Sequence, residues 1–182
     1  YLRGLLAEVE RKNGWQLAEY AGYRHPRGIQ RVLDRYAWDA DLVRDDLRRW
    51  VEAELGDPTG VLVVDETSFP KQGRHSVGVA RQYCGTLGKI ANCQVGVFLG
   101  YASPAGHALI DRALFVPAAW FADPDRCRKA GIPTTVGFRT KPQLALDLIE
   151  RALDAGVPAR WVVADEAVSY THLRAHETPE HL

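Results

Sequence analysis

Two aspartates occupy matching places one hundred positions apart: Asp65 follows the apolar run 61–64, and Asp165 follows the apolar run 161–164. The first run begins just after Pro58 and Gly60, and it predicts a short strand with both faces buried. If the two strands are parallel neighbours, the carboxylates meet at the edge of the sheet where open α/β folds bind their ligands. Adjacent carboxylates repel each other unless a cation lies between them, and oxygen ligands suit Mg²⁺ or Mn²⁺. The pattern therefore predicts a metal site at Asp65 and Asp165, although either aspartate alone is equally typical of a turn after a strand.

The net charge of the chain is zero, but the charges are unevenly distributed. Residues 68–141 carry ten lysines and arginines against three acids, whereas residues 1–57 carry ten against eleven. A basic stretch beside an acidic metal site suits a polyanionic substrate, because the cations hold the phosphates next to the reacting one. The candidate phosphate-binding side chains are Lys71 and Arg74, in a turn-rich loop beside Asp65, together with Arg81 and Lys89. A solvated basic surface without a ligand is the alternative.

Residues 1–57 show helical periodicity. One short segment ends at Gly22, and a second helix starts at Pro26, directs Arg27 and Arg31 outward and turns its apolar residues inward. Two short helices around a glycine-containing turn are compatible with a helix-turn-helix domain that contacts DNA through these arginines. A helical bundle facing solvent is at least as consistent with the pattern. The residues expected to face inward on the second helix are Ile29, Val32, Leu33 and Tyr36.

A third, longer helix is expected to begin after Asp39, whose side chain is suited to capping it. The helix is amphipathic and precedes a clear break at residues 56–60, where we place a domain boundary. The residues expected to face inward on this helix are Leu42, Val43, Leu47, Trp50 and Val51.

Beyond this break, extended segments are expected over residues 77–84, 91–102 and 107–116, and Leu109 of the third is expected in the core. An irregular segment is expected to follow over residues 117–133. A capping box from Thr140 to Gln143 starts a helix that ends at Gly156 and buries residues up to Leu153. The predicted fold class is α/β. It comprises an incomplete ribonuclease-H-like domain with a mixed sheet over residues 58–167, preceded by a small all-helical domain over residues 1–57.

Cysteine content and hydropathy exclude several classes of protein. The three cysteines, Cys84, Cys93 and Cys127, are odd in number and lack CxxC spacing, so we expect reduced thiols rather than a disulfide framework or a zinc site. No apolar run approaches the roughly 18 residues that span a membrane, and no signal peptide opens the chain. The absence of methionine, even at position 1, leads us to expect a fragment.

Five segments together resemble the DDE transposases of IS701-type, IS4-like bacterial insertion sequences, with similarity from about Gly14 to Ala167. The resemblance implies that Asp65 and Asp165 are the first two acids of the DDE triad. They would bind the two Mg²⁺ or Mn²⁺ ions that activate water, or a DNA 3′-hydroxyl, for attack on a phosphodiester. It also implies a bacterial cytoplasmic enzyme that acts on double-stranded DNA at insertion-sequence ends and targets, homo-oligomeric in its full-length parent. The segments are residues 61–67, 76–83, 92–98, 108–112 and 161–166.

The sequence departs from this family pattern after Ala167. The third acid of the triad is expected on a later helix that is absent here, so we expect a truncated chain that cannot complete the reaction by itself. Residues 168–182 continue no family motif and resemble a foreign peptide, which we expect to be disordered.

Two other classes of function, one enzymatic and one non-enzymatic, fit part of the pattern. A Mg²⁺-dependent nucleotide hydrolase would need a G-x-x-x-x-G-K-[ST] loop upstream of the first strand, and the sequence has none. A phosphatase of the Asp-x-Asp class would need an aspartate where Thr67 stands. A non-catalytic DNA-binding module that uses only the helical N-terminal part is the second alternative.

Overall fold

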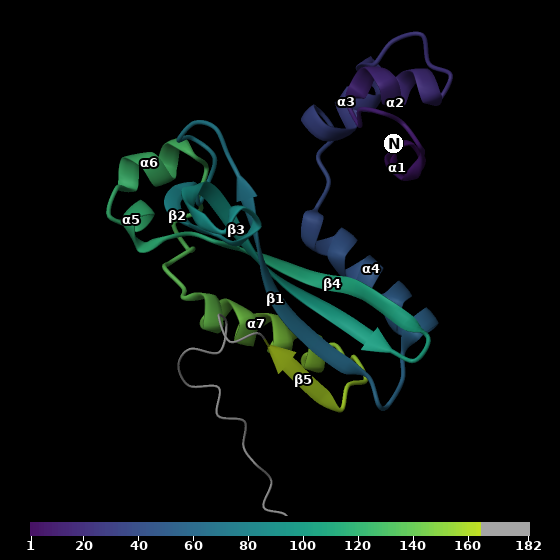
Figure 1. Cartoon of the computed structure of the whole chain (residues 1–182), viewed down its shortest axis with the longest axis vertical. Helices are drawn as coiled ribbons and strands as arrows, with labels where there is room; N and C mark the ends of the chain where they lie inside the picture. The colour runs from purple at the N-terminus through teal and green to yellow at the C-terminus, as the bar shows by residue number, and fades with distance from the viewer. Residues whose placement is uncertain (165–182) are drawn as a thin grey trace, which may run out of the picture. The chain divides into compact units, whose positions relative to one another are not determined.

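The computed structural model describes residues 1–164 and divides the chain into two compact units, Tyr1–Leu42 and Val43–Leu182 (Figure 1). The first unit contains α1 (Leu2–Leu6), α2 (Gly14–Tyr20) and α3 (Arg27–Asp34), which confirms its predicted helical character. The side chain of Asn13 caps α2 by accepting the backbone N–H groups of the second and third residues that follow it.

The core of the first unit is small and consists of Leu17, Ala18 and Ile29. The prediction that Leu33 and Tyr36 face inward is wrong, because they are 61% and 63% exposed. The three helices have eight residues or fewer, and so few turns offer little surface under which a second row of side chains can be buried.

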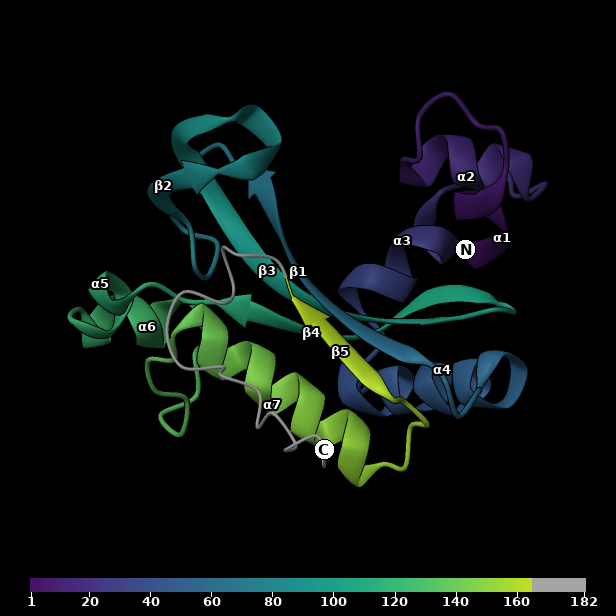
Figure 2. The same ribbon diagram turned by 60° about the horizontal axis from the view of Figure 1, so that its bottom comes forward.

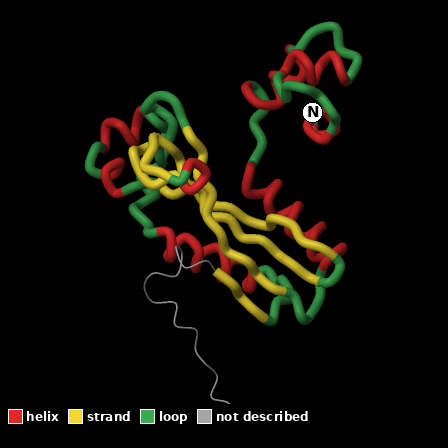
Figure 3. The backbone as a smooth tube through the Cα atoms, in the orientation of Figure 1, coloured by secondary structure: helices red, strands yellow, loops and turns green. Residues whose placement is uncertain are grey.

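The second unit is built on a mixed sheet of five strands, as predicted: β1 (Val61–Pro70), β2 (Ala80–Cys84), β3 (Lys89–Ser103), β4 (Gly106–Phe115) and β5 (Trp161–Ala164) (Figure 3). The long strand β3 pairs antiparallel with β1 along one edge and with β2 and then β4 along the other. The strand β5 pairs parallel with the outer edge of β1. A short 3-10 turn, η1 (Gly85–Leu87), joins β2 to β3.

One face of this sheet is packed and the other is open. The helices α4 (Ala40–Leu55) and α7 (Lys141–Asp154) cover the packed face, where Leu62 and Val64 of β1 lie in the main core (Figure 2). On the other face, Val63 of β1 is 38% exposed. The prediction that β1 is buried on both faces is therefore wrong, because no element among residues 1–164 covers its second face.

The helix α4 uses a different face from the one predicted. Asp39 caps it as expected, by accepting the N–H groups of Asp41 and Leu42. Val51 is buried in the core against the sheet, but the side chains of Arg44 and Arg48 face inward with it, at 9% and 12% exposure. The other apolar residues expected inward are exposed: Leu42, Val43, Leu47 and Trp50.

Arg44 of α4 faces a buried carboxylate, that of Asp111, whereas Arg48 pairs with Asp45 of its own helix at 3.3 Å. A β-bulge between β3 and β4 at Leu99 and Gly100 shifts the alternation of β4, so that Ile110 and Asp111 are both buried. The same shift places Leu109 opposite Gly100 on the open face, where it is 58% exposed rather than in the core as predicted.

Asp111 joins three elements through this bulge. Its carboxylate lies 2.8 Å from Nε of Arg151 in α7 and 3.7 Å from Nε of Arg44 in α4, and Arg112 of β4 is also within 3.7 Å. Most of α4 therefore belongs with the sheet. The division between the units lies at 42/43, inside α4, instead of at the predicted boundary after residue 57.

The connection from β4 to α7 contains α5 (Ala118–Phe121) and α6 (Pro124–Lys129), so the prediction of an irregular segment there is wrong. The capping box of Thr140 and Gln143 at the start of α7 is confirmed, whereas Leu153 near its end is exposed. The three cysteines are free thiols, as predicted. Within residues 1–164, no helix has the length and apolar character needed to cross a membrane.

The substitution Asp111→Asn tests the joint between α4, β4 and α7. It should lower the free energy of unfolding by about 2 kcal/mol, because Arg151 and Arg44 lose the buried carboxylate that they share, whereas Arg44 keeps its 2.8 Å pair with Asp45. Asp46→Asn is the matched control, since its ion pair with Arg49 is 69–71% exposed and should contribute about 0–1 kcal/mol. Urea denaturation of both variants measures the difference, and equal losses would contradict the assignment of Asp111 as the joint.

Candidate metal and nucleic-acid site

The strands that precede the two predicted acids are parallel neighbours, as expected. Their register pairs Val61 with Trp161 and ends with Val64 opposite Ala164. Each residue of this last pair is followed directly in the sequence by an aspartate, Asp65 or Asp165. Asp165 itself lies outside the described residues, as does the segment 168–182.

Asp65 lies in the middle of β1 rather than at its end. The prediction that the strand stops there is wrong, because antiparallel pairing with β3 continues as far as Pro70 opposite Cys93. Asp65 is paired with Phe98 on that side, whereas the described pairing with β5 stops one residue earlier. Asp65 is therefore the first residue of β1 beyond its described pairing with β5.

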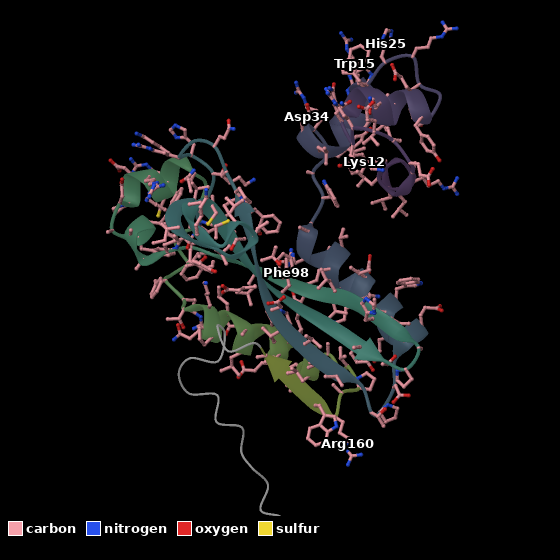
Figure 4. All side chains as sticks on the ribbon, in the orientation of Figure 1. Lys12, Trp15, His25, Asp34, Phe98 and Arg160 are labelled. Atoms are coloured by element: carbon pink, nitrogen blue, oxygen red, sulfur yellow. The ribbon has the colours of Figure 1, made fainter. Side chains whose placement is uncertain are left out.

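The carboxylate of Asp65 is exposed on the open face of the sheet. One of its oxygens accepts the backbone N–H of Glu66 at 2.7 Å, and no cationic side chain of residues 1–164 forms an ion pair with it. It borders a shallow, mainly apolar hollow of about 350 Å³ that also includes Phe98, labelled in Figure 4, and His107. An exposed carboxylate without a protein cation suits a divalent metal ion. Residues 1–164 contain no group of three or more potential ligands, so a complete site requires Asp165 or other residues outside that range.

Glu66 points to the packed face and has a different role. Its Oε2 lies 2.6 Å from Nζ of Lys141, the first residue of α7, and both side chains are largely buried. The ammonium of Lys141 also lies 5.6 Å from the ring centroid of Phe115 in β4. This ion pair fixes the start of α7 against β1 beside Asp65. The sequence analysis missed it, and the only sequence signal was the position of Lys141 inside the capping box.

Comparison with known proteins identifies the family. A family model described as "DDE superfamily endonuclease" matches residues 1–177. The chain belongs to the DDE endonuclease superfamily.

A similar curated protein is named as a transposase. It is the "Probable transposase for insertion sequence element IS701" of Microchaete diplosiphon, 29% identical over 168 residues, which are 89% of this chain and 40% of the relative. The chain thus spans less than half the length of that relative. No solved structure matches. The predicted resemblance to IS701-type DDE transposases and the ribonuclease-H-like class of the mixed sheet are both confirmed.

In this DDE endonuclease chain, the segment before β1 fixes where β1 and β5 begin. The carbonyl of Gly60 accepts the N–H of Arg160 at 2.7 Å, and Arg160 lies at the start of β5 (Figure 4). The buried Tyr101 of β3 accepts the N–H of Asp57 at 2.8 Å and donates its hydroxyl to the carbonyl of the same residue at 3.1 Å. Hydrogen bonds from Thr59 to the side chain of Asp57 hold the pKa of that carboxyl below its usual value and close the turn.

Among the candidate DNA-binding residues of the sheet unit, Arg74 and Arg81 border one hollow. Lys71, Arg74, Arg81 and Lys89 are all exposed. Lys71 and Arg74 follow Pro70, which is five residues beyond Asp65 and therefore about 17 Å away along the strand, not beside it as predicted. In the N-terminal unit, Arg27 and Arg31 lie on the exposed face of α3. They line a hollow of about 640 Å³ with Gln30, Asp34, Arg35 and Tyr36.

The substitution Gly60→Ala tests whether this turn sets the pairing of β1 with β5. A methyl group at position 60 would lie 2.3 Å from the hydroxyl of Tyr101, which is packed and hydrogen-bonded, so we expect a loss of about 1–3 kcal/mol in stability. Gly100→Ala is the control, because the nearest atom to its methyl group lies at 3.6 Å. Thermal unfolding should show a lower melting temperature for Gly60→Ala alone; a smaller loss at position 60 than at position 100 would refute the role of the turn.

Proposed function

We propose that this chain is part of a transposase that cleaves and joins double-stranded DNA at insertion-sequence ends, with Asp65 and Asp165 as metal-binding catalytic acids. The observation that carries the proposal is the parallel register of β1 and β5, in which Val64 is opposite Ala164 and each directly precedes an aspartate. Membership of the DDE endonuclease superfamily supports the reaction class, and the IS701 relative supports the substrate. A nucleotide hydrolase is disfavoured, since the chain has no phosphate-binding loop before β1.

The chemistry follows from the position of the carboxylates. Asp65 offers exposed oxygen ligands on the open face, and Asp165 is proposed to supply the next ones, so the residues fit Mg²⁺ or Mn²⁺. When bound, such a metal pair would activate a water or a DNA 3′-hydroxyl and stabilise the leaving oxygen. The protein's own part is to hold the acids in register through the β1–β5 pairing and the Glu66–Lys141 ion pair.

The remaining parts of the proposal concern partners. Lys71, Arg74, Arg81 and Lys89 are proposed to hold phosphates along the sheet unit, and Arg27 and Arg31 to contact DNA from α3. The exposed basic face of α3 favours a second candidate, a DNA-binding module whose activity depends on the helical unit alone. Homo-oligomerisation and a bacterial cytoplasmic location belong to the proposal for the complete transposase.

The substitution Asp65→Ala in a transposase that carries this chain tests the function. Cleavage should fall to background because the metal site loses a ligand, while DNA binding should stay within about threefold, since the aspartate makes no contact that holds phosphate. Asp46→Ala is the control, because its carboxylate is 71% exposed and pairs with Arg49 in the same helix turn. A gel assay of Mg²⁺-dependent nicking, run beside a binding assay, separates the two effects. If the Asp65→Ala variant still cleaves DNA, Asp65 is not part of the site. If the unsubstituted protein binds DNA but does not cleave it, the DNA-binding module is favoured.

A further inference from the structure

The helices α5 and α6 are anchored to the loop that follows β1 (Figure 1). The indole of Trp120 is fully buried and donates to the carbonyl of Val79 at 3.0 Å. The guanidinium of Arg126 lies 3.6 Å from the ring centroid of Trp120 and donates to the carbonyls of Arg74 and Val79 at 3.1 and 3.2 Å. These contacts hold the backbone of the loop against α6.

The sheet holds the same loop from its other side. The side-chain amide of Asn92 in β3 donates to the carbonyls of Lys71 and Gly73, both at 2.8 Å. The backbone N–H of Lys71 donates in return to the carbonyl of Asn92 at 2.9 Å. The loop backbone is therefore fixed at both ends, whereas the side chains of Lys71 and Arg74 are exposed. A fixed backbone lowers the entropy that these cations lose when they bind an anion.

Two adjoining hollows of about 400 and 540 Å³ open between this loop and α6, and both are bordered by Arg74 and Arg126. Arg81 and Lys129 complete the set of cations around them, and His75 lies in the first hollow.

The acids around the hollows are already engaged. Asp123 caps α6 by accepting the N–H of Arg126 at 2.9 Å. Asp125 pairs with Arg128 at 2.7 Å. The four cations around the hollows outnumber these two carboxylates, so the surface is positive and suits phosphate groups.

We propose that the groove between residues 71–79 and α6 binds the sugar–phosphate backbone of duplex DNA, with Arg126 and Lys129 of α6 as its second wall beside Arg74. The inference rests on the proposed function and adds to it the wall formed by α6, which the sequence analysis did not assign. The groove begins at the end of β1, about 17 Å along the strand from Asp65. Such contacts position the duplex without reading its sequence.

The test is the salt dependence of binding to a fluorescent duplex of random sequence, measured with the full chain. Arg74→Ala with Lys129→Ala removes one cation from each wall. It should reduce the slope of log K against log salt by about 1.8, because each phosphate that is no longer neutralised lowers it by about 0.9. Both side chains are exposed and should leave the fold intact. Lys129→Ala alone should give half the change.

The control variant removes the same charge elsewhere in the sheet unit. Arg49→Ala with Arg160→Ala takes one cation from α4 and one from the start of β5, which is the opposite end of β1 from the groove. Its slope should equal that of the wild type. An unchanged slope in the Arg74/Lys129 variant, or an equal reduction in the control, would overturn the groove while leaving the proposed function standing. A wild-type chain that binds no duplex would instead contradict the proposed function, and the groove with it.

Discussion

The parallel hydrogen bonding between β1 and β5 is the interaction on which the site depends. Only four residue pairs are described, from Val61–Trp161 to Val64–Ala164, yet they join segments one hundred residues apart. Because side chains alternate along a strand, a slip of one residue would turn Val163 and the residues that follow it to the opposite face. The chemistry proposed for Asp65 and Asp165 therefore requires this register and no neighbouring one.

Several contacts away from the acids stabilise the register. The carbonyl of Gly60 is hydrogen-bonded to Arg160 at the start of both strands, and Tyr101 holds the turn that precedes β1. On the packed face, the Glu66–Lys141 pair fixes α7 beside the aspartate. Asp111 joins α4, β4 and α7 further along the same face. The site is thus positioned by the ends of its strands and by the helices beneath them, whereas its own face of the sheet is open within the described residues.

Much of this arrangement could be predicted from local patterns. The alternation in β3, the capping box at Thr140 and the apolar runs before the aspartates each depend on neighbouring residues, and each led to the right element. The pairing of β1 with β5 was a hypothesis that followed from the repeated pattern of an apolar run and an aspartate, and the register of the two strands confirms it.

The errors arose where tertiary contacts override a local pattern. The α4 helix has an apolar face, but it turns Arg44 inward toward Asp111, which is buried by a bulge that no periodicity reveals. The length of β1 beyond Asp65 depends on its partner β3, and the helices α5 and α6 depend on Trp120 reaching the carbonyl of Val79. Each of these features requires a partner more than ten residues away in the sequence.

The most direct test of the central claim is a crystal structure of the protein with Mn²⁺, in which anomalous scattering locates the metal. The account predicts a peak within about 2.0–2.2 Å of a carboxylate oxygen of Asp65 and of Asp165, on the open face of the sheet. A metal bound by only one of the two aspartates, or carboxylates on opposite faces of the sheet, would contradict it.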